Sequence, residues 1–251
     1  MKIIVTAGPT NERIDAVMKI TNMSTGSLGS TIVDTLLEEH ENEIEKIYYI
    51  STILAKKPII NEKIELIEID STEELIHELE SIFSKDKIDV IIHSSAVGDY
   101  KGKYVIRGED LVEEILNYIK EASKEQLTAD NLIKILESPK NVCNDETKIS
   151  SYEPHLMTML TLTPKVISRI KQMAPNVKLI GFKLLEGVTK EHLYEVAHNL
   201  LVKNNADYIV ANDLSKISNG KHWGMLINKD GIICECETKK EIAKAISKII
   251  I

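Results

Sequence analysis

Strand-like and helix-like segments alternate along most of this chain, and this alternation constrains its fold more than any other feature. Short apolar runs rich in Ile, Val and Tyr are separated by segments whose apolar residues recur at helical spacing. The expected strands cover residues 2–6, 44–51, 64–69, 90–93, 156–162, 178–182, 208–211, 224–228 and 232–235. The expected helices cover residues 27–39, 72–83, 164–173, 190–203 and 239–250. This order predicts an α/β fold: a Rossmann-like, mostly parallel sheet with helices on both faces and a C-terminal β-hairpin.

One segment interrupts the alternation. Residues 104–147 are polar and contain two expected amphipathic helices, at 109–121 and 128–136. We therefore expect a single domain, residues 1–251, from which this segment protrudes as an insertion. It is either an ordinary surface excursion or, as long insertions in compact domains often are, a lid or a partner-binding arm.

Charge and cysteine content narrow the class of protein. The chain has 39 acidic and 31 basic residues and a net charge of −8, which argues against a general nucleic-acid or membrane-surface binder. Its three cysteines are too few for a disulfide framework and fit a reducing compartment. No apolar stretch approaches the ~18 residues of a membrane span, and the first apolar run is too short for a signal peptide. We expect a cytoplasmic protein.

The first strand leads into a glycine-containing loop and then a helix. Gly8 and Thr10 follow the strand, and Ser24, Thr25 and Gly26 precede the helix. Ligands of open α/β sheets bind at such strand-to-helix crevices, and the free N–H groups of a helix start favour phosphate. The residues therefore indicate a nucleotide site or, alternatively, only a tight turn with a helix cap. The G-x-G-x-x-G fingerprint, the Walker motif and a Tyr-x-x-x-Lys pair are all absent.

Polar or small residues also follow two later strands. Ser95, Ala96 and Asp99 come after one of them, and Asn212 and Asp213 after another. Small residues let a flat base approach the backbone, and Asp99 can accept from an amine or a ribose hydroxyl, or simply cap a turn. We expect both strand ends to lie at the same edge of the sheet as the first loop.

Two lysines are candidates for neutralising phosphate. They are Lys148 and Lys183, although an isolated lysine is more often solvated surface. Phe182 precedes Lys183, and core packing is its default explanation.

Seven motifs together resemble one enzyme family in order and spacing. They are TAGPT with ID at 6–10 and 14–15, ITNMSTGSLG at 20–29, HSSAVGDY at 93–100, KISS at 148–151, LTPKVI at 162–167, GFKLL at 181–185 and ANDL at 211–214. The chain resembles the phosphopantothenate–cysteine ligases, or phosphopantothenoylcysteine synthetases, of coenzyme A biosynthesis. It is most similar to the stand-alone bacterial form, in which no flavin-binding decarboxylase domain precedes the ligase.

The resemblance implies a homodimer that joins 4′-phosphopantothenate to L-cysteine. The co-substrate is a nucleoside triphosphate, CTP in most bacterial members and ATP in eukaryotic ones, used with Mg²⁺. The pantothenate carboxylate attacks the α-phosphate, pyrophosphate leaves, and the cysteine amine opens the acyl-nucleotide. The resemblance assigns no metal ligands in the protein, since the Mg²⁺ of the family sits mainly on the triphosphate.

The resemblance also implies roles for individual residues. Asn22 is the catalytic residue that holds the activated acyl group, and Lys148 reaches the triphosphate. Residues 104–147 correspond to a dimerisation flap. The implied nucleotide-binding residues are Gly8, Thr10, Ser95, Ala96, Asp99, Phe182 and Lys183. The implied substrate-binding residues are Ser24, Thr25, Gly26, Lys19, Asn212 and Asp213.

The sequence departs from the family pattern at one position. Met18 stands where the family usually has an arginine, four residues before Asn22. We hypothesise that Lys19 or Arg13 supplies the missing positive charge. Two alternatives stay open: an NAD(P)-dependent reductase of Rossmann type, and a non-catalytic nucleotide-binding protein.

Overall fold

The computed structural model describes residues 1–143, 149–150, 152–218 and 220–251. These residues form two compact units. The first unit comprises Met1–Thr10, Asn22–Val97 and Pro164–Ile251, and the second comprises Asn11–Thr21 and Gly98–Thr163. The second unit thus contains the insertion expected at 104–147 together with the segments that flank it and a separate N-terminal piece.

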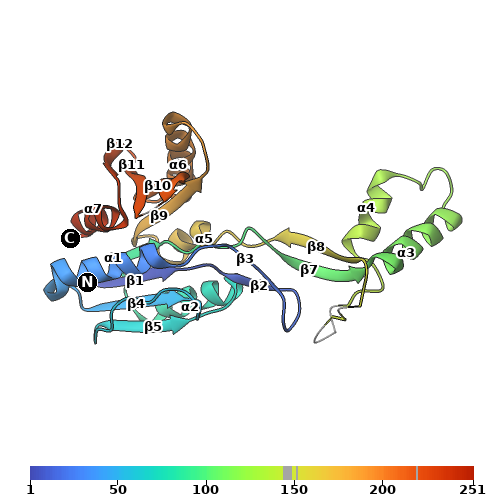
Figure 1. Ribbon diagram of the computed structural model, residues 1–251, viewed down its shortest axis with the longest axis horizontal. Helices are drawn as coiled ribbons and strands as arrows, with labels where there is room; N and C mark the ends of the chain where they lie inside the picture. Colours follow the sequence, from blue (N-terminus) through green and yellow to red (C-terminus); the bar gives the residue numbers. More distant parts are fainter. Residues whose placement is uncertain (144–148, 151, 219) are drawn as a thin grey trace. The chain divides into compact units, whose positions relative to one another are not determined.

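An eight-stranded sheet forms the centre of the first unit (Figure 1). In spatial order its strands are β12 (Gly231–Cys236), β11 (Lys221–Asn228), β10 (Tyr208–Ser218), β9 (Lys178–Leu185), β6 (Val90–His93), β1 (Lys2–Ala7), β4 (Lys46–Ser51) and β5 (Ile64–Glu68). The strands from β10 to β5 are parallel, and β11 and β12 each run antiparallel to the preceding strand. The predicted mostly parallel α/β sheet is confirmed.

Helices cover both faces of this sheet, because its central strands carry apolar residues on both sides. Along β1, Ile3 and Val5 face the core beneath α1 (Ser27–His40) and α7 (Lys239–Ile250). Ile4 faces the opposite core, which α2, α5 and α6 cover. The three helices are α2 (Thr72–Lys85), α5 (Val166–Met173) and α6 (Lys190–Asn204). Figure 1 shows α1 and α7 side by side.

Side-chain caps set the starts of three described helices of the first unit. Ser71 accepts from the N–H of Glu74 at the start of α2, and Thr238 accepts from the N–H of Glu241 at the start of α7. Thr189 does the same for α6. Helix α1 differs because its N-cap, Gly26, has a φ of +72° and offers no side-chain cap. This uncapped helix start lies at the carboxyl edge of the sheet.

The second unit contains two small sheets and two helices. β2 (Asn11–Arg13) pairs with β3 (Lys19–Thr21), and β7 (Tyr100–Arg107) pairs antiparallel with β8 (Leu156–Leu162). The helices α3 (Gly108–Glu121) and α4 (Ala129–Glu137) lie in the chain between β7 and β8. Arg107 stands opposite Leu156, so the chain leaves this ladder and returns to it at the same end.

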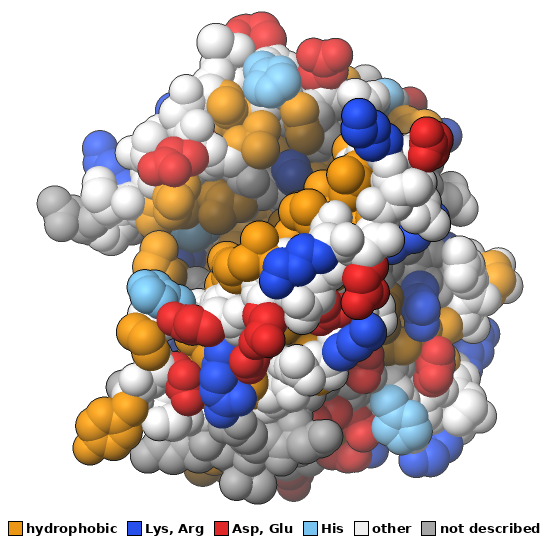
Figure 2. All heavy atoms as spheres, turned by 90° about the vertical axis from the view of Figure 1, so that its right-hand side faces the viewer, with side chains coloured by type: hydrophobic (Ala, Val, Ile, Leu, Met, Phe, Trp, Pro, Cys, Tyr) orange, Lys and Arg blue, Asp and Glu red, His pale blue; other side chains and the backbone are white. Residues whose placement is uncertain are grey.

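The helices α3 and α4 bury one side and expose apolar residues on another. Leu111 of α3 is buried against Tyr104 and Ile106 of β7, with Leu136 of α4 packed beside them. Other apolar residues of the two helices are exposed, namely Val112, Leu116, Ile119 and Ile133. Figure 2 shows one face of the molecule, on which hydrophobic side chains gather between charged ones.

Three strands were not expected from the sequence. β2 and β3 have three residues each, too few for an alternating pattern to be recognisable. β7 begins with Tyr-Lys-Gly-Lys, and lysine and glycine are depleted in strands. Its partner β8 was expected as a strand, but it pairs with β7 and not with the main sheet. Among the described residues, no helix has both the length and the apolarity needed to cross a membrane.

Candidate active site

The loops after β1 and β6 are joined at the carboxyl edge of the sheet. The N–H of Ala96 donates to the carbonyl of Gly8 at 2.9 Å, and the N–H of Thr10 donates to the carbonyl of Ala96 at 3.3 Å. Pro9 and Ala96 form a parallel bridge between these bonds. The two strand ends that the sequence indicated as binding loops are therefore neighbours in the first unit.

Glycines allow three backbone segments to meet beside these loops. Gly8 has a φ of +79°, and a Cβ there would lie 2.5 Å from the Cβ of Ala55. A Cβ on Gly26 would lie 3.1 Å from the backbone nitrogen of Gly8. The N–H of Lys56 donates to the carbonyl of Thr25, which ties the loop after β4 to the start of α1. A side chain at position 8 or 26 would collide with or crowd these neighbours, and both positions have a positive φ that favours glycine.

The first turn of α1 suits an anion. It contains no acidic residue, and its N-cap provides no side-chain oxygen. Within the described residues, the N–H groups of Leu28 and Gly29 have no acceptor. Free N–H groups and the helix dipole both favour negative charge at such a position.

Asn22 lies next to the joined loops and is exposed. Its Nδ2 donates to the carbonyl of Ala96 at 3.0 Å and to that of Val97 at 3.2 Å. Both N–H bonds of the amide are directed at the backbone of the β6 loop, and the Oδ1 atom has no partner in the described part of the chain. The amide thus fixes the loop and presents an unbonded acceptor.

Polar groups lie directly beneath the β6 loop. The Oγ1 of Thr6 is 2.8 Å from the Nδ1 of His93 and also accepts from the N–H of Ser95 at 3.3 Å. Complete burial lowers the pKa of His93 to about 4, so its ring is neutral near pH 7. The Oγ of Ser95 is buried and has no hydrogen-bond partner among the described residues. Such a hydroxyl is costly unless another group bonds it.

Several of the predicted binding residues form side-chain hydrogen bonds within the fold. The hydroxyls of Ser24 and Thr25 accept from the N–H groups of Gly26 and Ser27, each at 3.4 Å. The buried Thr10 accepts from the hydroxyl of Thr72 at 3.1 Å. Asn212 donates to the carbonyl of Trp223 at 3.1 Å. Asp213 accepts from the N–H of Gly187 at 2.9 Å and from the Ser215 hydroxyl at 2.8 Å, and these bonds lower the pKa of Asp213. These side chains hold loops at the carboxyl edge.

Phe182 and Lys183 lie near the carboxyl end of β9. Phe182 packs against the core beneath α1 and α7, as its default interpretation predicted. Lys183 follows it in the strand, so it projects from the opposite face of the sheet. The two neighbours therefore cannot act from the same side of β9.

Three other predicted residues are not placed in this crevice. Lys148 lies outside the described residues. Lys19 and Asp99 belong to the second unit, where the carbonyl of Asp99 accepts from the N–H of Thr163 at 3.0 Å.

The β2–β3 segment, which contains Met18, has its own organisation. Asp15 holds the turn by accepting from the N–H groups of Val17 at 2.7 Å and Met18 at 2.6 Å. Lys19 stands opposite Arg13 in the ladder. Directly opposed residues project from the same face, so the two candidate replacements for the missing arginine are close neighbours.

Sequence reasoning missed two residues at this edge. Ala55 contacts both glycines, and Lys239 of α7 donates to the Ser27 hydroxyl at the start of α1. Neither follows a glycine-rich strand end, so no motif indicated them. Within the described ranges, no three His, Cys, Asp or Glu side chains are grouped so that they could hold a metal ion.

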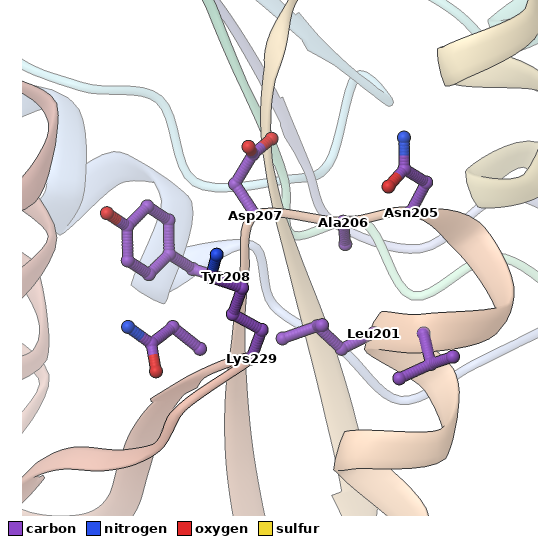
Figure 3. Close-up of a pocket in the computed structure, with 8 residues that line it drawn as sticks. Leu201, Asn205, Ala206, Asp207, Tyr208 and Lys229 are labelled. Atoms are coloured by element: carbon purple, nitrogen blue, oxygen red, sulfur yellow. The ribbon is translucent and has the colours of Figure 1, made fainter.

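A separate pocket of about 440 Å³ lies at the opposite, amino-terminal edge of the sheet (Figure 3). It is lined by Leu201 at the end of α6, by Tyr208 at the start of β10, and by Lys229 in the β11–β12 turn. Ligands of parallel α/β sheets bind at the carboxyl ends of strands. The group of loops around Gly8 and Gly26 is therefore the better candidate for the active site.

These observations define the class of protein as a Rossmann-like α/β protein with an anion-compatible helix start at the carboxyl edge of its sheet. The sequence model of the DNA/pantothenate metabolism flavoprotein C-terminal domain family matches residues 1–108 and 138–251. The chain belongs to this family.

Curated relatives are similar to most of the chain. The coenzyme A biosynthesis bifunctional protein CoaBC of Thermococcus kodakarensis is 27% identical over 229 residues, which is 91% of this chain and 45% of the relative. The CoaBC protein of Borreliella burgdorferi is 26% identical over 254 residues, 99% of this chain and 52% of the relative. The chain thus spans about half the length of the curated relatives it matches.

Solved structures share the fold. The DNA/pantothenate metabolism flavoprotein from Streptococcus pneumoniae has a TM-score of 0.80 and 36% identity, covering 100% of this chain and 98% of that one. The H337A mutant of Cab2 in complex with phosphopantothenate-cysteine has a TM-score of 0.63 and 13% identity, covering 99% of this chain and 87% of that one. At that identity the second likeness concerns the fold alone.

Proposed function

We propose that this protein is a phosphopantothenate–cysteine ligase of coenzyme A biosynthesis. It forms an amide between 4′-phosphopantothenate and L-cysteine, using CTP or ATP. The family membership and the crevice around Gly8, Gly26 and the β6 loop support this proposal. The main support for the proposal is the start of α1, which has no side-chain cap and no acidic residue in its first turn. Gly8 and Gly26, both with positive φ, lie beside it, and such a helix start favours phosphate.

In the proposed reaction, the nucleotide activates the carboxylate. A carboxylate oxygen of phosphopantothenate attacks the α-phosphorus, and the bond to the β-phosphate oxygen breaks, releasing pyrophosphate. The cysteine amine then attacks the acyl carbon, loses a proton, and displaces the nucleoside monophosphate. Binding and orientation supply most of the rate enhancement in such a sequence.

Asn22 and the β6 loop would act on these reacting groups. The unbonded Oδ1 of Asn22 can accept from the incoming amine, while its Nδ2 keeps Ala96 and Val97 in position. A side chain as small as that of Ala96 would let a flat base approach the backbone of this loop. The buried, unpartnered hydroxyl of Ser95 lies in the same loop.

Mg²⁺ would be held mainly by the triphosphate. The described residues offer no cluster of three metal-ligating side chains, and Mg²⁺ commonly binds substrate phosphates with few protein ligands. Bound there, the ion neutralises charge on the phosphates during attack.

Arg13 and Lys19 would bind the phosphate of phosphopantothenate in place of the arginine that Met18 replaces. They face each other across the β2–β3 ladder, so one phosphate group can contact both positive charges.

The proposal includes a homodimer formed through the second unit. β8 exposes Leu156, Met157, Leu160 and Leu162, with exposed fractions of 38% to 64%. Apolar residues gathered on a two-stranded ladder are typical of a surface that another chain covers. Sedimentation equilibrium on the purified protein tests this part, and a monomer at micromolar concentration would refute it.

The decisive test of the activity is pyrophosphate release. Purified protein is given phosphopantothenate, L-cysteine, Mg²⁺ and either CTP or ATP, and the product mass is checked. Cysteine-dependent product is expected with at least one nucleotide. Nucleotide binding without turnover would favour a non-catalytic nucleotide-binding protein, and nicotinamide or flavin absorbance in the purified protein would favour a reductase.

A further inference from the structure

One lysine reaches the start of α1 from a distant part of the sequence. The Nζ of Lys239, the first residue of α7, donates to the hydroxyl of Ser27, the first residue of α1. Lys239 is partly buried, whereas its neighbour Lys240 is exposed and pairs with Glu38 on the side of α1. We propose that Lys239 binds a phosphate group of the substrates in the crevice, a role that rests on the function proposed above.

Sheet topology brings α7 to this crevice. β12 runs antiparallel to β11, and β11 runs antiparallel to β10, so β12 has the direction of the parallel strands. The helix that follows β12 therefore begins at the carboxyl edge, as the helix after β1 does. Lys239 shares this edge with Gly8 and Ser95 although they are far apart in sequence.

In the part of the chain that the structure describes, no acidic side chain offsets the charge of Lys239. Within the described residues no carboxylate pairs with Lys239, and the first turn of α1 contains no acid. The carboxylate of Glu241 caps the start of α7, where it accepts from the N–H of Glu237. A lysine in the first turn of a helix is also disfavoured by the helix dipole. An anion bound at this point would offset both effects.

His222, a titratable residue that interacts with Lys239, adds no charge near pH 7. Burial, and then the positive charge of Lys239, lowers the pKa of His222 to about 4. The ring is therefore neutral near pH 7, and its Nδ1 is buried without a hydrogen-bond partner in the described part of the chain. Lys239 is thus the cation of this cluster.

The available donors match a phosphate group. An ammonium group has three N–H donors, and Ser27 accepts one of them. Two remain, and the N–H groups of Leu28 and Gly29 lie in the same first turn of α1 without an acceptor among the described residues. A phosphate has several acceptor oxygens and can bond to backbone and ammonium donors together.

Two substrates of the proposed reaction carry phosphate, namely the nucleoside triphosphate and 4′-phosphopantothenate. The experiment separates them by titrating each alone into the full-length protein by calorimetry, and by measuring KM for each. The variants are Lys239→Met and Lys239→Arg, with Lys240→Met as the matched control. Melting temperatures of all variants report whether the fold is intact.

Lys239→Met is expected to weaken binding of one phosphate ligand by about tenfold or more, the size typical of a charged hydrogen bond. Lys239→Arg should retain most of the affinity, and Lys240→Met should stay within twofold of the wild type. A loss confined to CTP or ATP assigns Lys239 to the triphosphate, and a loss confined to phosphopantothenate assigns it to that substrate.

The proposal is overturned if Lys239→Met leaves both affinities unchanged, or if the wild type binds neither ligand. A failure of the proposed ligase function would give a different set of results. In that case the wild type binds a phosphate ligand and loses affinity on Lys239→Met, but forms no cysteine-dependent product. If Lys239→Met does not fold, the phosphate-ligand affinities of Lys239→Arg and Lys239→Gln are compared in its place. Equal affinities of these two variants would count against the proposal.

Discussion

The side-chain amide of Asn22 is bonded to the backbone carbonyl of Ala96 at 3.0 Å, so a residue just before α1 holds the loop after β6. This bond links two strand ends that are 74 positions apart in the sequence. It also orients the amide, whose Oδ1 then faces away from the loop carbonyls.

Asn22→Asp is expected to stop the reaction after its first step. The substitution removes both N–H donors and places a carboxylate against the carbonyl oxygens of Ala96 and Val97. We expect product formation to fall about 100-fold or more, because the β6 loop loses the two bonds that position it, while acyl-nucleotide accumulates. Rapid-quench mass analysis measures the intermediate. Lys148→Gln should instead slow the first step, and identical failure of both variants without intermediate would refute this division.

Gly8→Ala is expected to destabilise the protein more than Gly187→Ala. Both residues have positive φ, but a Cβ on Gly8 would lie 2.5 Å from the Cβ of Ala55, whereas none of the described atoms lies within 4 Å of a Cβ on Gly187. We expect a loss of about 2–4 kcal/mol for Gly8→Ala, from strain and overpacking, and about 1 kcal/mol for Gly187→Ala. Urea denaturation measures both. Equal losses would show that the Ala55 contact is unimportant.

Acid is expected to destabilise the fold through His93. The folded pKa is about 4, below the usual 6.5, so only the unfolded chain gains a proton as the pH falls from 6.5 towards 4. This effect should lower the free energy of unfolding by about 2 kcal/mol between pH 7 and pH 5. His93→Gln removes the titration, so its urea midpoint should change less over this range. A variant with the same pH dependence as the wild type would contradict the assignment.

Arg13→Ala with Lys19→Ala is expected to raise the KM for phosphopantothenate about tenfold or more, because two phosphate-binding charges are lost. The KM for the nucleotide should change little. Arg169→Ala with Lys203→Ala serves as a control, because these two residues lie on α5 and α6 of the first unit. An unchanged KM for phosphopantothenate in the first pair would refute the idea that Arg13 or Lys19 replaces the arginine missing at Met18.

Most of the fold could be predicted because its signals are local. Strands such as β1 are continuous apolar runs, since both faces are buried, and Ser71 and Thr238 mark helix starts by their capping oxygens. β7 was missed because its first half carries lysine and glycine, and its pairing with β8 involves residues about 50 positions away.

Those parts of the candidate site that have a local sequence signal could also be predicted. A glycine that follows a strand and precedes a proline indicates a special turn, and Gly8 does adopt a positive φ. The contact of Ala55 with that glycine depends on where another loop lies in space, and so does the contact of Lys239 with Ser27. No local pattern encodes such contacts. The sequence also does not reveal that Asn212 and Asp213 bond mainly to their own fold.

The antiparallel pairing of β7 and β8 affects how the segment between these two strands can change in evolution. Because Arg107 stands opposite Leu156, the chain segment between these two residues begins and ends at the same end of the ladder. The cost of closing a loop grows only slowly with its length, so this stretch can gain or lose whole helices while the ladder persists. The family model skips residues 109–137, which hold nearly all of α3 and α4. Changes in this stretch therefore need not alter the ladder, which makes these two helices a natural place for features that differ between related chains.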